Sequence, residues 1–280
     1  MCRMLAFWGT RDSLEMLEPL LEAFVDACSN DRYLERVTEG AARCHCDGWG
    51  YAMVLNSDGG SHIVYERFYT PSEEEHRGTL IQATRRLIAL ARDYQEVTLL
   101  MHCRRAGRTE PKGVAHSHPY EVETNYHILY FAHNGSFRKD DLAMLLGLHP
   151  QLFTDSALAA RLYARLVESG GEPLDALRRL AFYTRTAFNT VTVMVERVSG
   201  RTMLTYSALT CSNDPARLDY YRIHVSATHE YFVYASSTVA EHPSASVLRW
   251  EKLSGGNGRV GYYERGLHLT QSARCPPVLE

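Results

Sequence analysis

Apolar residues recur at two spacings along the chain, and each spacing predicts a different element. Short apolar runs are typical of buried strands, whereas apolar residues at every third or fourth position are typical of helices. In the first two thirds of the chain, the short runs predict strands at residues 3–8, 49–56, 62–69, 97–102 and 127–132. The periodic stretches predict helices at residues 12–28, 71–93, 139–146, 155–169 and 173–185.

The last third of the chain is richer in strands than the rest. Its apolar runs predict strands at residues 190–198, 201–208, 221–227, 231–236, 246–253 and 259–265, with turns at 199–200 and 255–258. Strands, then helices, then strands again indicate an α+β fold in which two sheets pack together and helices cover the outside. No internal repeat, low-complexity block or Pro-rich linker interrupts the pattern, so we expect a single domain over residues 1–280.

Composition and charge exclude several classes of function. The chain is 45% hydrophobic and 22% charged, with a formal net charge of −3, so no basic excess points to nucleic acid or to a membrane surface. The longest apolar runs are far too short to span a bilayer, and the N-terminus lacks the features of a signal peptide. We therefore expect a cytoplasmic protein that binds neither nucleic acid nor membrane.

The seven cysteines are scattered and odd in number, which does not resemble a disulfide framework, so reduced thiols are expected. Cys44-His45-Cys46 could contribute to a zinc site only if further ligands, such as Cys103, His116 or His118, completed a set of four. The simpler interpretation is that Cys44 and Cys46 are small residues packed beside a turn. We expect no metal and no cofactor.

Cys2 is the first candidate for chemistry. If Met1 is removed, Cys2 carries both a thiol, with a reference pKa of about 8.5, and the α-amine of the chain, with a reference pKa of about 7.7–8.0. One residue then holds a nucleophile and a base, which is the logic of N-terminal nucleophile hydrolases. The alternative is that Met-Cys occurs at this terminus by chance.

Two polar segments could bind a substrate. His102-Cys103-Arg104-Arg105-Ala106 follows an apolar strand, and a guanidinium there could hold a carboxylate through two parallel hydrogen bonds. The alternative is that both arginines are solvated loop charges. His116-Ser117-His118-Pro119-Tyr120 could line a pocket or form an ordinary turn.

Two further segments would complete a site. Asn134 and Gly135 follow a strand, and the Asn side-chain N–H and the Gly backbone N–H could both face an oxyanion, although Asn-Gly is also a common turn. Asp155 could be a first-turn residue of a helix or could accept hydrogen bonds from a substrate ammonium group. Together the candidates supply a nucleophile, a carboxylate clamp, an oxyanion hole and an ammonium acceptor, the minimum for cleaving the side-chain amide of an α-amino acid.

The ordered set resembles the class II glutamine amidotransferase domain, a branch of the N-terminal nucleophile hydrolases. The matching segments are Met1-Cys2-Arg3, Asp47-Gly48-Trp49-Gly50, His102-x-Arg104-x-Ala106, His118-Pro119, Ala132-His133-Asn134-Gly135 and Thr154-Asp155-Ser156. The resemblance implies a four-layer αββα sandwich, which agrees with the order of strands and helices. The chain looks most like the stand-alone subgroup that includes the ergothioneine-pathway γ-glutamyl hydrolase and the glutathione-degrading amidase.

The resemblance also implies a role for each matching residue. Cys2 would attack the amide of glutamine or a γ-glutamyl compound and form a γ-glutamyl thioester, with its α-amine as base and then acid. Arg104 would bind the substrate α-carboxylate, Asp155 its α-ammonium, and Asn134 with Gly135 would form the oxyanion hole. The pocket would be shaped by Asp47, Gly48, Trp49 and His118.

Two alternatives remain open at this point. The chain could donate ammonia to a separate synthase partner, or it could be a catalytically silent module that binds glutamine.

Overall fold

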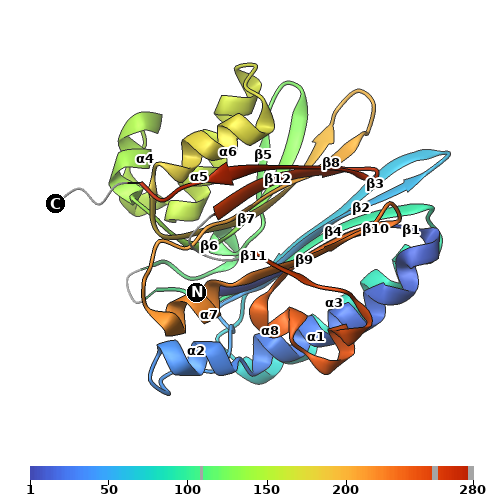
Figure 1. Cartoon of the computed structure of the whole chain (residues 1–280), viewed down its shortest axis with the longest axis horizontal. Coiled ribbons are helices and arrows are strands. Elements are labelled where there is room, and N and C mark those ends of the chain that lie inside the picture. The colour runs from blue at the N-terminus through green and yellow to red at the C-terminus, as the bar shows by residue number, and fades with distance from the viewer. Residues whose placement is uncertain (108–109, 254–257, 277–280) are drawn as a thin grey trace.

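The computed structural model describes residues 1–107, 110–253 and 258–276, and its centre is a pair of stacked antiparallel sheets (Figure 1). The seven-stranded sheet has the order β11-β9-β10-β1-β4-β2-β3 and the six-stranded sheet the order β13-β12-β8-β7-β6-β5. The strands of the first sheet are β1 (Cys2–Thr10), β2 (Trp49–Ser57), β3 (Gly60–Phe68), β4 (Glu96–Arg104), β9 (Ile223–Ala227), β10 (Tyr231–Ser236) and β11 (Glu251–Leu253). Those of the second are β5 (Tyr120–Glu123), β6 (His127–Phe137), β7 (Thr184–Glu196), β8 (Thr202–Ala208), β12 (Gly258–Glu264) and β13 (Leu267–Ala273).

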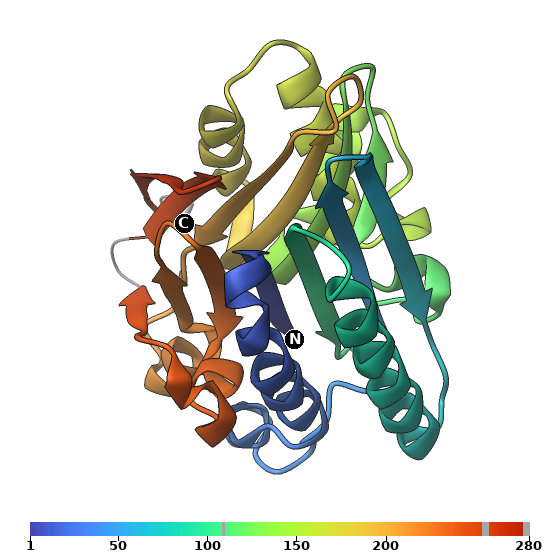
Figure 2. The same ribbon diagram turned by 90° about the vertical axis from the view of Figure 1, so that its right-hand side faces the viewer.

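Helices cover the outer face of each sheet. On the seven-stranded sheet, α1 (Leu17–Ser29) and α3 (Glu73–Ala91) lie side by side (Figure 2). On the six-stranded sheet the cover consists of α4 (Lys139–Leu146), α5 (Asp155–Glu168) and α6 (Pro173–Ala181). The remaining helices are α2 (Arg32–Val37), α7 (Pro215–Tyr221) and α8 (Ser237–Ala240), with 3-10 turns η1 (Arg11–Met16), η2 (Val114–His116), η3 (Pro150–Leu152) and η4 (Pro243–Val247). The predicted α+β sandwich with helix, sheet, sheet and helix layers is therefore confirmed.

Alternation along the strands produces three apolar layers. In β1, Leu5 and Phe7 pack under the helices α1 and α3, whereas Met4, Ala6 and Trp8 pack against the other sheet. Successive side chains of a strand point to opposite faces, so every even-numbered residue of β1 faces the space between the sheets. A strand buried on both faces reads as one continuous apolar run, as β1 does.

The predicted element boundaries fail mainly in the last third. The strand expected at residues 246–253 is wrong over residues 246–250, because Pro243 starts the turn η4 and only Glu251–Leu253 pairs as β11. Pro215 likewise opens the unpredicted helix α7, so the strand expected from residue 221 begins at Ile223. Proline fits the first turn of a helix because its fixed φ is already helical and its missing N–H is not needed there. The turn expected at 255–258 lies largely outside the described residues.

Helix ends and short elements also differ from expectation. The chain from Arg11 to Met16 is a 3-10 turn, and the α-helix begins only at Leu17. The helix expected at residues 173–185 ends at Ala181, and Thr184 already begins β7. The short elements α2, α8, β5 and β13 were not predicted, since each is too short or too polar to show a clear period.

The expectation of reduced cysteines is wrong for four of the seven. Disulfides join Cys44 to Cys46 and Cys211 to Cys275, whereas Cys2, Cys28 and Cys103 are free. Cys211 follows β8 and Cys275 follows β13, and both strands flank β12, so their ends meet with a Cα–Cα distance of 5.6 Å. Such a long-range meeting leaves no signal in the local pattern. Within the described parts of the chain, every helix is too short or too polar to cross a membrane.

Candidate active site

Cys2 opens β1 and faces the space between the sheets. It lies directly opposite Arg104, the last residue of β4, in the antiparallel register of β1 and β4. His102 is two residues earlier on β4 and therefore shares the same face. From the other sheet, Asn134 near the end of β6 lies on the same face as Tyr130 and Ala132, which belong to the layer between the sheets. Three strand ends thus bring a thiol, an imidazole, a guanidinium and an amide to one end of the sandwich.

Asn134 contacts the backbone of the proposed nucleophile directly. The backbone nitrogen of Cys2 donates a hydrogen bond of 3.0 Å to Oδ1 of Asn134, and both residues are buried. The Nδ2 group of Asn134 is buried and has no hydrogen-bond partner among the described residues. A buried donor without a partner costs about 1–3 kcal/mol, so this N–H would gain from an acceptor beside the Cys2 thiol.

The surroundings of the Cys2 thiol favour the thiolate. Burial alone would raise the pKa of this thiol, but three other influences act in the opposite direction. The ammonium group of Met1, the neighbouring His102 and the charge of Arg104 together lower the pKa from 9.0 to about 6. The thiolate is the reactive form of cysteine, so these surroundings favour reactivity of the Cys2 thiol.

We expect alkylation of Cys2 by iodoacetamide to have a midpoint below that of a free cysteine, because nearby positive charge lowers the pKa of this thiol. The rate should be at its plateau above that midpoint and should fall as pH drops through it, because protonation removes the thiolate. Mass spectrometry of the Cys2 peptide over a pH series measures the rate, with a short unstructured cysteine peptide as the control. A midpoint equal to that of the control peptide would contradict this account of the site.

Arg104 is held in place by the loop that precedes β2. Its backbone nitrogen donates to the carbonyl of Gly48 at 2.7 Å, and its own carbonyl accepts from the backbone nitrogen of Asp47 at 2.8 Å. The guanidinium is 4% exposed and donates from Nη1 to the carbonyl of Pro111 at 2.7 Å. The strand end is therefore fixed, and Nη1 is the guanidinium atom that this contact occupies.

Asp47 and Gly48 hold the backbone segments that surround the site. The Asp47 carboxylate accepts from the backbone nitrogen of Ala106 at 3.0 Å and from Nζ of Lys112 at 2.6 Å. It thereby fastens the segment that follows Arg104. Gly48 has a φ of +119°, and a Cβ there would lie 2.2 Å from Oγ of Ser117, so no larger residue fits without displacement.

Trp49 lies on the opposite face of the sheet from Cys2. Its indole stacks on Phe68 and donates from Nε1 to Oγ1 of Thr79 in α3 at 3.2 Å. It belongs to the apolar layer beneath α1 and α3. The structure therefore does not bring the Trp49 side chain to the site, and its contribution to a pocket would be indirect.

His118 lies beside His102 in the interior. The two rings have centroids 4.0 Å apart, and the ring of Tyr120 lies 4.6 Å from that of His118. Neither ring nitrogen of His118 has a partner among the described residues, and only 3% of the residue is exposed. Burial and the nearby charges of His102 and Arg104 lower the pKa of His118 well below its usual value, so its imidazole is neutral.

His102 was not assigned a role from the sequence. Its Nε2 lies 3.2 Å from the carbonyl of His133, which makes Nε2 the protonated nitrogen in the neutral ring. Its Nδ1 has no partner in the described part of the chain. The signal that could have found it was its place two residues before Arg104, because alternate residues of a strand share a face.

Gly135 and Asp155 lie at the junction of β6 and α5. Gly135 has a φ of +149°, and a Cβ there would lie only 1.9 Å from the carbonyl oxygen of Ala187, so the close approach requires glycine. Asp155 follows the N-cap residue Thr154. Its Oδ2 accepts from the backbone nitrogen of Phe137 at 2.8 Å and its Oδ1 from that of Ser156 at 2.7 Å. The carboxylate joins α5 to the end of β6, and each oxygen keeps lone pairs for a further donor.

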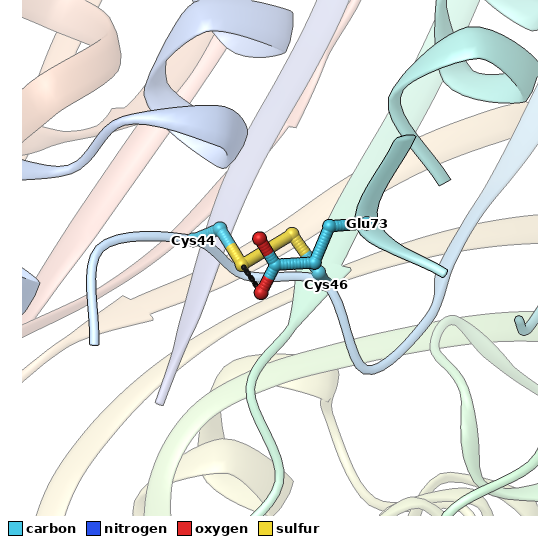
Figure 3. Close-up of side chains that lie close together, drawn as sticks. All are labelled: Cys44, Cys46 and Glu73. Carbon is cyan, nitrogen blue, oxygen red and sulfur yellow. Dashed lines mark hydrogen bonds between the residues drawn. A yellow bond between two sulfur atoms is a disulfide. The ribbon is translucent and has the colours of Figure 1, made fainter. Parts of the chain in front are cut away.

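One group of possible metal ligands lies outside this site. In the described part of the chain, the donor atoms of Cys44, Cys46 and Glu73 lie within 4.8 Å of one another (Figure 3). Sγ of Cys44 is 3.2 Å from Oε1 of Glu73. The Cys44–Cys46 disulfide uses both sulfurs, and metals are bound by thiolates, so only one carboxylate remains as a ligand. Cys103, His116 and His118 are not part of this group.

Comparison with known proteins finds solved structures that have a similar fold. The chain matches no protein-family model and no curated protein sequence. Among solved structures it is similar to the glutamine phosphoribosylpyrophosphate amidotransferase of B. subtilis complexed with ADP and GMP, with a TM-score of 0.57 and 12% identity. It is also similar to an allosteric regulatory enzyme of purine biosynthesis, with a TM-score of 0.56 and 13% identity. Each alignment covers 97% of this chain and 49% of the other, so this chain spans about half the length of those proteins.

Proposed function

We propose that this protein hydrolyses the side-chain amide of glutamine or of a γ-glutamyl compound, with Cys2 as the nucleophile once Met1 has been removed. The observation that carries the proposal is the contact between Cys2 and Asn134. The same amide accepts from the nitrogen that would become the α-amine, and its buried N–H group has no partner among the residues that the structure describes. The shared fold with a glutamine amidotransferase supports the same chemistry.

The chemistry proceeds through a thioester. The α-amine of Cys2 takes the thiol proton, and the sulfur attacks the amide carbon to form a tetrahedral intermediate. Nδ2 of Asn134 and the backbone N–H of Gly135 donate to its oxyanion. The α-ammonium then gives its proton to the amide nitrogen, the C–N bond breaks, and ammonia leaves a γ-glutamyl thioester on Cys2. Water, deprotonated by the α-amine, attacks this thioester and releases the γ-carboxylate, which regenerates the thiol.

Arg104 and Asp155 would select the amino acid part of the substrate. The guanidinium lies opposite Cys2 at the end of β4 and offers paired donors to an α-carboxylate. The Asp155 carboxylate at the β6–α5 junction would accept from the α-ammonium. Because these two groups recognise both charges of a free α-amino acid, the best substrates are amides in which the γ-glutamyl α-carboxylate and α-amine are unmodified.

Arg104→Ala is expected to raise KM for glutamine by about 10–100-fold, because a hydrogen bond to a charged partner contributes about 1.5–3 kcal/mol. Steady-state measurement of ammonia release gives KM and kcat. Arg105→Ala is the matched control, since this neighbouring guanidinium lies 3.8 Å from Asp47 rather than facing Cys2. Equal KM values for wild type and Arg104→Ala would remove Arg104 from the carboxylate clamp.

A second candidate function is the donation of ammonia to a separate synthase partner, and the likeness of fold to an amidotransferase favours it. Glutamine hydrolysis by the purified protein alone, at a rate that a co-purifying enzyme does not increase, supports the hydrolase. Activity only in the presence of such an enzyme supports the donor subunit, and glutamine binding without any turnover supports a silent module.

A further inference from the structure

On the side of β1 that faces β10, the ladder of backbone hydrogen bonds ends before it reaches Cys2. Met1 and Arg105 exchange two hydrogen bonds, of 2.8 and 2.6 Å, so in the alternating antiparallel ladder the next pair, Cys2 and Arg104, exchanges none. The N–H and C=O groups of Cys2 therefore face the β10 side of the strand. Pairing with β10 begins only at Leu5, which lies opposite Ala235. The nucleophile thus depends on side chains for its backbone contacts.

Two side chains supply donors to the carbonyl of Cys2. Oη of Tyr220 lies 3.2 Å from this oxygen, and Nη1 of Arg3 lies 3.3 Å from it. The same Nη1 also donates to the carbonyl of Tyr220 at 3.1 Å, and the guanidinium lies over the Tyr220 ring at 4.3 Å from its centroid. Arg3 therefore links the residue that precedes it to the end of α7.

Arg3 is itself fixed by a buried ion pair. Its Nη2 lies 2.6 Å from Oδ2 of Asp31, and both side chains are completely buried. The Asp31 carboxylate also accepts from Oγ1 of Thr238 at 2.7 Å and lies 2.7 Å from Nε2 of His45. Although burial alone would raise the pKa of Asp31, the charge of Arg3 and the contact with His45 lower it, so the carboxylate stays ionised. Loss of either partner would leave the other charge buried and uncompensated, so the two side chains fix each other in place.

We propose that Arg3, fixed by Asp31 and acting with Tyr220, is a positioning group that holds the carbonyl of Cys2 and so aims its nitrogen at Asn134. This inference rests on the proposed function. Removal of Met1 would also remove the two hydrogen bonds between residue 1 and Arg105. In the mature protein, the contacts to the nitrogen and the carbonyl of Cys2 would then be the ones that orient the terminal residue.

A positioning role for Arg3 predicts a change in kcat without a change in KM. The Arg3 side chain leaves β1 on the face opposite the thiol, since successive residues of a strand alternate. It therefore lies away from Arg104, the proposed substrate clamp. Loss of the positioning contacts should lower kcat and the rate of Cys2 labelling, while KM for glutamine stays unchanged. A merely structural role would lower the melting temperature and leave the labelling rate of the folded protein as it was.

The decisive comparison is Tyr220→Phe with Tyr263→Phe. Both tyrosines are 1% exposed, and Tyr263 donates to the carbonyl of Thr228 at 3.1 Å, beyond the far end of β10. Each substitution removes one hydroxyl from a buried site, and neither changes a charge. We expect Tyr220→Phe to slow labelling of Cys2 by an electrophilic glutamine analogue about three- to tenfold, as the loss of one hydrogen bond predicts. Tyr263→Phe should label at the wild-type rate.

Arg3→Met/Asp31→Asn removes both charges of the pair together, because loss of one partner alone would leave the other buried and unpaired. We expect about a hundredfold loss of kcat and of labelling rate in the folded variant, with KM unchanged. Equal labelling rates for wild type, Tyr220→Phe and Tyr263→Phe would overturn the positioning role, even if the double variant failed to fold. A wild-type protein that is neither labelled nor active would instead overturn the proposed function, and this inference with it.

Discussion

Replacing Cys2 with alanine is expected to abolish amide hydrolysis, with a loss of at least about 10⁴-fold in kcat. The reason is that the covalent route disappears with the sulfur. Removal of a nucleophile costs most of the catalytic acceleration because the remaining groups act only through it. The measurement is ammonia release from glutamine. Following it over hours at high protein concentration allows the very low kcat expected of Cys2→Ala to be detected.

Cys103→Ala is the matched control for this experiment. Cys103 is also a buried free thiol near the end of β4, but it points into the layer beneath α1 and α3. Its replacement should leave kcat near the wild-type value even if it lowers stability. Full activity in Cys2→Ala, on every amide that the wild type cleaves, would show that the thioester mechanism is wrong.

Replacing Asn134 is expected to have the second-largest effect. Loss of one oxyanion donor typically costs about 10²–10³-fold in kcat, and Asn134→Ala also removes the acceptor for the Cys2 nitrogen. Asn134→Asp separates the two roles, because aspartate keeps an acceptor oxygen but has no N–H. If the Nδ2 group is the oxyanion donor, Asn134→Asp should lose activity although it keeps the acceptor, and Asn134→Ala should lose at least as much.

Asn56→Ala serves as the control for Asn134. Asn56 is a largely buried amide that donates to Glu96 at 2.8 Å, near the end of β2 that is remote from Arg104. Its loss should change the melting temperature without changing kcat. A wild-type kcat in Asn134→Asp would mean that the oxyanion is stabilised by other donors, and the assignment of Nδ2 would have to be withdrawn.

The fold was predictable from sequence where long elements have a clear period. The continuous apolar run in β1 and the helical spacing in α3 and α5 each indicated the right element, and the order of strands and helices indicated the layers. The failures lie where local signals are weak. Pro215 and Pro243 each begin a short helical turn within a stretch whose apolar residues resemble a strand. Strand pairing then depends on partners far along the chain, which no local window contains.

The candidate site was predictable only in part. Motif order pointed to Cys2, Arg104 and Asn134, and their shared face follows from the alternation of residues along strands. The sequence could not show that Trp49 lies on the other face, because that depends on which side of β2 the helix α3 covers. Nor could it show the ion pair between Arg3 and Asp31, whose partners meet only through the fold.

The intact mass of the purified protein, before and after treatment with an electrophilic glutamine analogue, shows whether Cys2 is a processed N-terminal nucleophile. The proposed mechanism requires a free Cys2 amine and a nucleophilic thiol in a glutamine-shaped pocket. We therefore predict loss of the mass of Met1, followed by the addition of a single adduct that maps to Cys2. A protein that keeps Met1 and gains no adduct would contradict the account and leave a glutamine-binding module as the better description.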